Sequence, residues 1–235
     1  MTIGSCFKEY LINILYIMIS ILMPIYNGIE FIDESVSSIL NQTYENWELL
    51  IGINGHPENS DVFKTAKKYE SDSRIKVYDF YTIKSKSQTL NKLTKFSNYN
   101  YIALLDVDDI WLPHKLFIQS TLLGEYDVIG SNCVYFGDME GIVPRIPVGD
   151  ISNFNFFEVN PIINSSAVIR KDLCYWEYCW EGIEDYDLWL RLCKLNKKFF
   201  NCKDILIKHR IHINSAFNSK GQDVNKLKVS HIQHW

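Results

Sequence analysis

Three carboxylates, Asp106, Asp108 and Asp109, lie directly after the apolar run YIALL. Carboxylates this close repel one another unless a metal ion, a basic side chain or water compensates their charge. Because Val107 separates Asp106 from Asp108, both carboxylates can turn toward one point. Oxygen ligands at this spacing suit Mg²⁺ or Mn²⁺, which usually bridge to substrate phosphates. The alternative is a solvated acidic loop in which Asp109 caps the next helix.

A second acidic pair, Glu184 and Asp185, opens the segment EDYDLWLRLCKLN, whose apolar residues have helical spacing. Acidic residues in a first helical turn are favoured by the helix dipole, so a structural role alone could explain them. The same helix end would also keep a carboxylate ionised near neutral pH. Such a group can take the proton of an attacking hydroxyl as a general base.

The segments before Asp106 alternate between strand and helix patterns. Apolar runs at 18–24, 47–53, 74–80 and 101–106 predict strands, and the segments between them have helical spacing. Three strand–helix units in a row predict an α/β fold with a mostly parallel sheet flanked by helices. In such sheets ligands bind at the carboxyl ends of the strands, where Asp106 and Asp108 lie.

The second half of the chain is less regular. The segments 127–138 and 141–149 predict two strands with a turn between them, and 197–212 predicts a closing strand. The last residues, NSKGQDVNKLKVSHIQHW, are polar, and we expect a mobile tail that orders only on binding. The sequence has no internal repeat and no linker rich in proline or glycine, which favours one domain.

Composition limits the classes of function. The chain of 235 residues is 47% hydrophobic and has a net charge of −4 without a long basic run, so nucleic-acid binding is not expected. The six cysteines form no CxxC pair and are expected to be reduced thiols of a reducing compartment. The apolar run YLINILYIMISILMPI is shorter than the about 20 residues of a spanning helix. We expect a cytoplasmic protein whose residues 1–17 could contact a membrane surface peripherally.

Three segments in this order resemble the family 2 glycosyltransferases, which have the GT-A fold. They are ILMPIYNGIEFIDESVSSILNQTYENWELLIGING, YIALLDVDDIWLPHKL and EDYDLWLRL. The match runs over residues 19–215 and implies a GT-A domain at 18–215, with a nucleotide-binding half at 18–110 and an acceptor half at 111–215. Residues 1–17 would be an extension and 216–235 a tail.

The resemblance also implies the chemistry. It would be metal-dependent, inverting transfer of a sugar from a nucleotide-diphospho-sugar, with Mn²⁺ or Mg²⁺ as cofactor. The family's commonest nucleotide is UDP. The acceptor would be a hydroxyl of a glycan, a lipid-linked molecule or a protein.

The resemblance places the nucleoside at the ends of the first two strands. Pro24, Tyr26 and Asn27 match a turn that lies over the base and the ribose. Asn54 lies where the family usually has a base-binding aspartate, a departure that leaves the choice of nucleotide open.

The diphosphate side is implied by two further matches, Asn91 and Arg210, and by lysines near the first of them. Asn91 matches the second residue of an Arg-Asn pair, but Leu90 departs from the first. Lys86, with Lys84 nearby, could supply the missing cation, or both lysines could simply be solvated. Arg210 would neutralise the leaving diphosphate.

The remaining matches concern the metal and the reacting groups. Asp108 would bind the metal most directly, Asp106 would hold the ribose or a metal-bound water, and His212 could be a further ligand. Asp185 would be the catalytic base, with Glu184 contacting the acceptor.

Two other functions fit part of the sequence. ALLDVDDI also looks like the motif of haloacid-dehalogenase-type phosphatases, with Asp106 as nucleophile and Asp108 as acid and base. That motif normally lies on the first strand, however, and here three strand–helix units precede it. A non-catalytic module that binds sugar nucleotides or glycans is the second alternative, and the retained Asp185 speaks against it.

Overall fold

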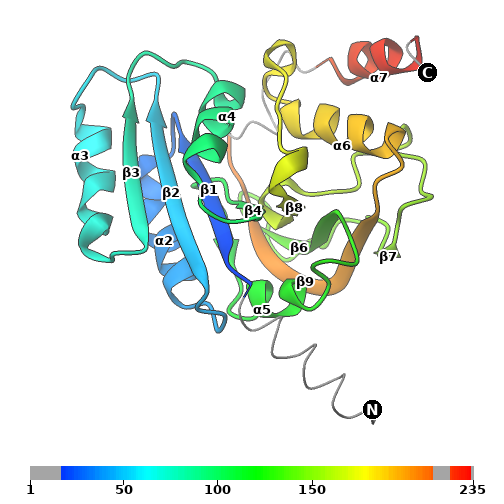
Figure 1. Ribbon diagram of the computed structural model, residues 1–235, viewed down its shortest axis with the longest axis horizontal. Helices are drawn as coiled ribbons and strands as arrows, with labels where there is room; N and C mark the ends of the chain where they lie inside the picture. The colour runs from blue at the N-terminus through cyan, green and yellow to red at the C-terminus, as the bar shows by residue number, and fades with distance from the viewer. Residues whose placement is uncertain (1–16, 214–222, 234–235) are drawn as a thin grey trace.

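The computed structural model describes residues 17–213 and 223–233 (Figure 1). Four parallel strands lead the chain, namely β1 (Ile19–Ile25), β2 (Trp47–Asn54), β3 (Ile75–Phe80) and β4 (Tyr101–Leu104). The helices that connect them are η1 (Ile29–Phe31), α2 (Ile32–Leu40), α3 (Asp61–Lys67), η2 (Lys68–Ser71) and α4 (Lys86–Phe96). The predicted strand–helix alternation of the first half is confirmed.

The second half completes the sheet with short and long strands. They are β5 (Ile110–Trp111), β6 (Val128–Gly137), β7 (Gly149–Asp150), β8 (Val168–Arg170) and β9 (Phe199–Ile211). The helices of this half are α5 (Lys115–Ser120), η3 (Asn164–Ser166), η4 (Lys171–Leu173), η5 (Tyr178–Trp180), α6 (Glu184–Lys194) and α7 (Val224–Ile232).

The strands form one mixed sheet in the order β3-β2-β1-β4-β8-β6-β9-β5, with β7 paired to β9. β8 runs antiparallel to β4 and to β6, while β6 and β9 are parallel. The α/β class is therefore confirmed, and the expectation of a mostly parallel sheet holds for the first half only. The reversal at β8 brings the end of β9 back toward the end of β4, where the carboxylates lie.

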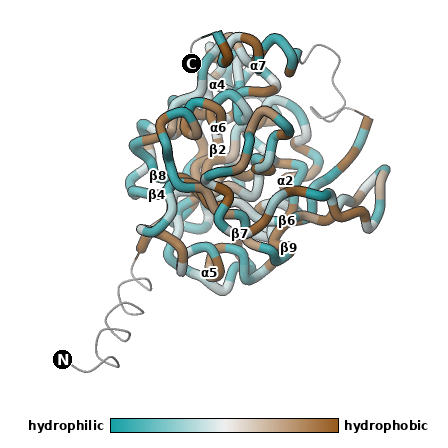
Figure 2. The backbone as a smooth tube through the Cα atoms, turned by 90° about the vertical axis from the view of Figure 1, so that its right-hand side faces the viewer, coloured by the Kyte–Doolittle hydropathy of each residue, from teal (hydrophilic) through white to brown (hydrophobic). Residues whose placement is uncertain are grey.

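Both faces of the central strands are covered, which explains their continuous apolar runs. All seven residues of β1 and all eight of β2 are buried. One core joins α2 and α3 to the sheet, and the other joins α4 and α6 to the opposite face. Figure 2 colours the backbone by the hydropathy of each residue. The helices that begin beside the carboxylates, α4 and α6, thus share one core.

The predicted strand at 141–149 is wrong except at its end. Only Gly149 and Asp150 pair with β9, and the preceding residues form no strand. Pro144 and Pro147 have no backbone N–H to donate, so this stretch cannot build a continuous ladder.

The expectation of a mobile tail is wrong for its described part. Residues Val224–Ile232 form α7, which packs on α6 (Figure 1). Leu227 is fully buried, and His231 Nε2 lies 2.9 Å from Asp187 Oδ1 on α6. The polar composition of this segment did not predict the helix, because the residues that stabilise it lie on α6.

The predicted extension at 1–17 lies outside the described residues apart from Ile17. Across 17–213 and 223–233, the structure contains no helix of the length and apolar character that crossing a membrane requires.

Substitution of Trp189 tests how much the packing of α6 in the shared core contributes to the free energy of unfolding. The Trp189 ring is fully buried, so Trp189→Ala should lower the free energy of unfolding by about 3–5 kcal/mol. Leu195, directly after the same helix, is 63% exposed, and Leu195→Ala should change it by less than about 0.5 kcal/mol. Urea unfolding followed by circular dichroism measures both. Similar small losses in the two variants would contradict the packing described here.

Candidate active site

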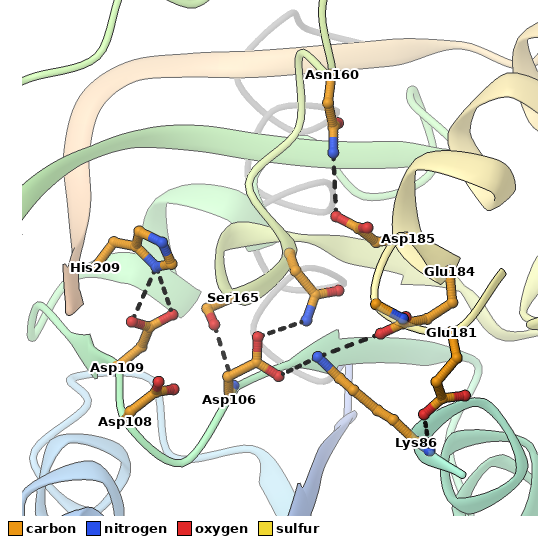
Figure 3. Close-up of polar contacts among 12 residues, drawn as sticks. Lys86, Asp106, Asp108, Asp109, Asn160, Ser165, Glu181, Glu184, Asp185 and His209 are labelled. Carbon is orange, nitrogen blue, oxygen red and sulfur yellow. Dashed lines mark hydrogen bonds and ion pairs between the residues drawn. The ribbon is translucent and has the colours of Figure 1, made fainter. Parts of the chain in front are cut away.

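The acidic residues meet at one edge of the sheet. The loop after β4 carries Asp106, Asp108 and Asp109, and Asp185 and Glu184 lie in the first turn of α6 (Figure 3). The end of β9 and the start of α4 border the same region. This is the carboxyl edge of the parallel strands, as the sequence predicted.

Asp106 is compensated by a lysine. Lys86 Nζ lies 2.7 Å from Asp106 Oδ1, and Asn164 Nδ2 donates to Asp106 Oδ2 at 3.0 Å. Burial raises the pKa of Asp106, but the lysine and the amide outweigh it, and the pKa ends below its usual value. Both oxygens of Asp106 therefore have protein partners.

Lys86 also reaches the second acidic group. Its Nζ lies 3.4 Å from Glu184 Oε1, on α6. Burial lowers the pKa of Lys86, but Asp106 and Glu184 raise it by more, so the lysine stays charged. One ammonium thus joins the loop after β4 to the first turn of α6 (Figure 3).

Asp108 faces His212 instead. The distance from Asp108 Oδ2 to His212 Nε2 is 3.0 Å. Burial, together with the negative charges of Asp109 and Asp106, raises the pKa of Asp108 to about 6. A carboxylate made costly by its neighbours is one that a cation would stabilise.

Asp108 and His212 offer ligand types that suit a divalent cation. A carboxylate oxygen and an imidazole nitrogen at hydrogen-bond distance are ligand types that Mn²⁺ accepts. In the described part of the chain, no group of three or more His, Cys, Asp or Glu side chains forms a complete cage. A cation held by Asp108 and His212 would complete its shell with water and substrate phosphates, as Mg²⁺ usually does.

Asp109 has a structural partner rather than a ligand role. It is fully buried, and both its oxygens lie 3.0 Å from His209 Nδ1 on β9. Arg210 N donates to Asp109 Oδ1 at 2.8 Å. Burial lowers the pKa of His209, but Asp109 outweighs this and raises it to about 9. The pair fastens the loop to β9, a function that the sequence did not reveal.

Arg210 lies between two aromatic rings. Its guanidinium carbon is 4.3 Å from the ring centre of Phe31 and 4.2 Å from that of Phe136. Arg210 Nε donates to the carbonyl oxygen of Asp108 at 2.9 Å, and Nη2 lies 2.9 Å from Glu34 Oε2. The side chain is 12% exposed, so its contacts support the loop, and the contact with a diphosphate stays a prediction.

Asp185 lies in a partly buried position at the start of α6. Asn160 Nδ2 donates to Asp185 Oδ2 at 3.2 Å. Burial and the negative charge of Glu184 together raise the pKa of Asp185 to about 6, against the opposing effect of Lys86. The group is ionised at neutral pH and close to the range in which general bases operate.

The nucleoside matches lie at the ends of β1 and β2. The ring of Tyr26 is 53% exposed, and Asn27 is exposed beside it. Asn54 is 1% exposed, and within the described residues its amide oxygen and nitrogen have no hydrogen-bond partner. A side chain on Gly55 would collide with Tyr26, since its Cβ would lie 2.1 Å from the ring. The exposed ring of Tyr26 could stack on a planar base. Contact between the Asn54 amide and a base stays a prediction, since both of its polar atoms are buried.

The other matches have different surroundings. Pro24 is buried within β1, opposite Gly52. Asn91 lies on α4, where its amide bonds to both backbone groups of Trp176 at 2.8 and 3.0 Å. Its contact with a nucleotide sugar stays a prediction. Lys84 is exposed and precedes α4.

Sequence reasoning did not identify the polar residues that hydrogen-bond to Asp106 and Asp185. Ser165 accepts a hydrogen bond from Asp106 N at 3.1 Å, beside Asn164 on η3, and Asn160 lies on the preceding loop. The stretch NPIINSS contains these residues, but nothing in its pattern predicted that the chain would turn back on the carboxylates.

Comparison with known proteins shows the family. Residues 20–174 match the model of glycosyl transferase family 2. UDP-Glc:alpha-D-GlcNAc-diphosphoundecaprenol beta-1,3-glucosyltransferase WfgD of Escherichia coli is 31% identical over 89% of this chain and 83% of its own length. The O-antigen biosynthesis glycosyltransferase WbnJ of the same organism is 31% identical over 86% of this chain and 83% of its own.

Solved structures show the same fold at low identity. TarS of S. aureus, in complex with UDP-GlcNAc, has a TM-score of 0.75 and 16% identity over 92% of this chain and 66% of its own. Mannosyltransferase PcManGT of Pyrobaculum calidifontis, in complex with GDP-Man and Mn2+, has a TM-score of 0.63 and 11% identity over 97% of this chain and 71% of its own. From its sequence, its GT-A-type fold and these relatives, the chain belongs to glycosyl transferase family 2 and is a glycosyltransferase.

Proposed function

We propose that this glycosyltransferase is metal-dependent and inverting, and that it moves a sugar from a UDP-sugar to a hydroxyl of a lipid-linked glycan. The observation that carries the proposal is the link through Lys86 between Asp106, on the donor side, and Glu184, directly before Asp185. Through this link, the group proposed to bind the donor lies close to the group proposed to deprotonate the acceptor. Family membership leaves no room for the phosphatase alternative.

The donor would bind at the edge of the parallel strands. Tyr26 would stack on the base and the unused amide of Asn54 would hydrogen-bond it. Asp108 and His212 would hold Mn²⁺ or Mg²⁺, which supplies positive charge to the departing diphosphate. Lys86, charged and partly buried, would add to that charge while it keeps Asp106 in place.

The chain's own acid–base step is at Asp185. Its carboxylate would take the proton of the acceptor hydroxyl as that oxygen bonds to the anomeric carbon. The bond from the anomeric carbon to the diphosphate breaks on the opposite face, which inverts the configuration. Asn160 would fix the direction of the Asp185 carboxylate, and Glu184 would contact the acceptor. Positioning and charge stabilisation supply most of the acceleration.

The relatives support the choice of substrates. WfgD is named for UDP-Glc and a diphosphoundecaprenol acceptor, and it matches this chain over most of its length. TarS was solved with UDP-GlcNAc. PcManGT, a more distant neighbour, was solved with Mn2+ and GDP-Man, so GDP is the competing nucleotide.

Nucleotide binding tests the donor site. In calorimetric titrations of UDP, GDP and TDP, UDP should bind only when Mn²⁺ is present. Asp108→Ala should weaken that binding by at least about 10–100-fold, because it removes a metal ligand. Asp172→Ala is the control, since Asp172 is exposed beside Arg170 at the opposite edge of the sheet. Equal binding with and without Mn²⁺ would contradict the metal assignment.

Replacement of the base separates binding from chemistry. Asp185→Asn keeps the shape and the contact with Asn160 but cannot accept the proton. It should lower kcat by about 10²–10⁴-fold and leave the affinity for UDP and Mn²⁺ unchanged. Transfer from UDP-glucose to a GlcNAc-diphospho-lipid measures the effect. Near-full activity of this variant would show that another group is the base.

The pH profile reports the same group. Because burial and Glu184 raise the pKa of Asp185 to about 6, the active carboxylate is present above this pH and is lost as the pH falls through it. We expect log kcat/KM at saturating Mn²⁺ to fall with a slope of about one below pH 6. Glu184→Gln removes a negative neighbour and should move this limb to lower pH. A limb that stays in place or moves upward would exclude Asp185 as its source.

A further inference from the structure

A strap, defined as residues 176–184, connects η4 and its following loop to α6 and is bonded to α4 at two points. At its start, Trp176 N donates to Asn91 Oδ1 at 3.0 Å and Asn91 Nδ2 donates to Trp176 O at 2.8 Å. At its other end, Glu181 reaches the first turn of α4 (Figure 3). Asp185 directly follows the strap in the chain. The position of the strap therefore affects the position of the first turn of α6.

The Glu181 carboxylate accepts three hydrogen bonds at the start of α4. Ser85 Oγ donates at 2.6 Å, Lys86 N at 2.6 Å and Ser87 Oγ at 3.3 Å. The first backbone N–H groups of a helix lack partners within the helix, and the dipole favours a negative charge there. The first turn of α4 has no acidic residue of its own, so Glu181 supplies that charge from the strap.

The same lysine is held from both directions. Its backbone N–H is bonded to Glu181, and its ammonium lies 3.4 Å from Glu184 Oε1 and 2.7 Å from Asp106 Oδ1. Two residues of the strap, three positions apart, are therefore attached to one residue of α4. Between them, Gly182 N donates to Glu184 Oε2, which closes the turn. Asp185 follows directly, so its distance from the donor side depends on this attachment.

We propose that Glu181 is a positioning residue, which fixes the general base Asp185 relative to the donor-side helix α4. The proposal rests on the proposed function, because it takes Asp185 as the base. Glu181 itself is exposed and contacts the helix start, and it acts on the reaction through the turn that opens α6. We expect loss of the Glu181 charge to lower turnover through the placement of Asp185 and to change the affinity for UDP little, because the Lys86 ammonium keeps its ion pairs with Asp106 and Glu184.

The test compares Glu181→Ala with a matched variant. Glu181→Ala should lower kcat by about 10–100-fold for transfer from UDP-glucose to a GlcNAc-diphospho-lipid, since small misplacements of reacting groups cost this much. The affinity for UDP with Mn²⁺ and the unfolding midpoint should stay close to those of the unaltered protein. Glu181→Gln keeps one acceptor oxygen and should lose less. Glu177→Ala removes the same charge from the strap at a residue without a hydrogen bond to α4 in the described chain, and should be neutral.

Hydrogen exchange provides a readout without turnover. Glu181→Ala should speed amide exchange over 177–183 and at the first turn of α4, whereas Glu177→Ala should not. Unchanged kcat in Glu181→Ala would overturn the proposal, and so would a loss matched by weaker UDP binding or by partial unfolding. If the unaltered protein neither binds a nucleotide with Mn²⁺ nor transfers sugar, the proposed function fails. In that case, faster exchange in Glu181→Ala but not in Glu177→Ala would still show that Glu181 attaches the strap to α4. Unchanged exchange in both variants would contradict this attachment too.

Discussion

The ion pairs of Lys86 are the constraint on which the rest of the site depends. The ammonium lies between Asp106, after the fourth strand, and Glu184, at the start of α6. These carboxylates belong to opposite halves of the fold, and in water their pairing would contribute little. Partial burial strengthens each attraction and makes an unpaired charge costly, so the lysine and both acids must stay together. The pairing therefore helps to hold α4, the loop after β4 and the start of α6 together.

The negative charges of the three neighbouring aspartates are compensated by three different partners. Asp106 is paired with a lysine, Asp109 with His209 on β9, and Asp108 faces His212. The contacts of the first two carboxylates hold the loop in place. Asp108, whose pKa is raised by burial and by its acidic neighbours, is the carboxylate that we propose binds the cation.

Local pattern predicted much of the first half of the fold, because each strand and helix there follows directly from its neighbours in the chain. It predicted less of the second half, where a long return strand and short antiparallel segments depend on contacts between distant residues. Polar composition suggested a mobile tail, but burial of Leu227 and the contact of His231 with Asp187 order α7. The roles of Asp109 and Arg210 were hidden for the same reason, since their partners come from β9, η1 and β6.

The buried amide of Asn54 lowers the stability of the fold, and the proposed contact with a base would give a reason for keeping it. Within the described chain its two polar atoms have no protein partner, and such a group costs about 1–3 kcal/mol when it stays unsatisfied. An apolar residue of similar size would remove that cost. If the amide reads the base, as we propose, the protein gives up part of its own stability for discrimination. A base that satisfies the amide would return this energy, so its binding should also strengthen the fold at the end of β2.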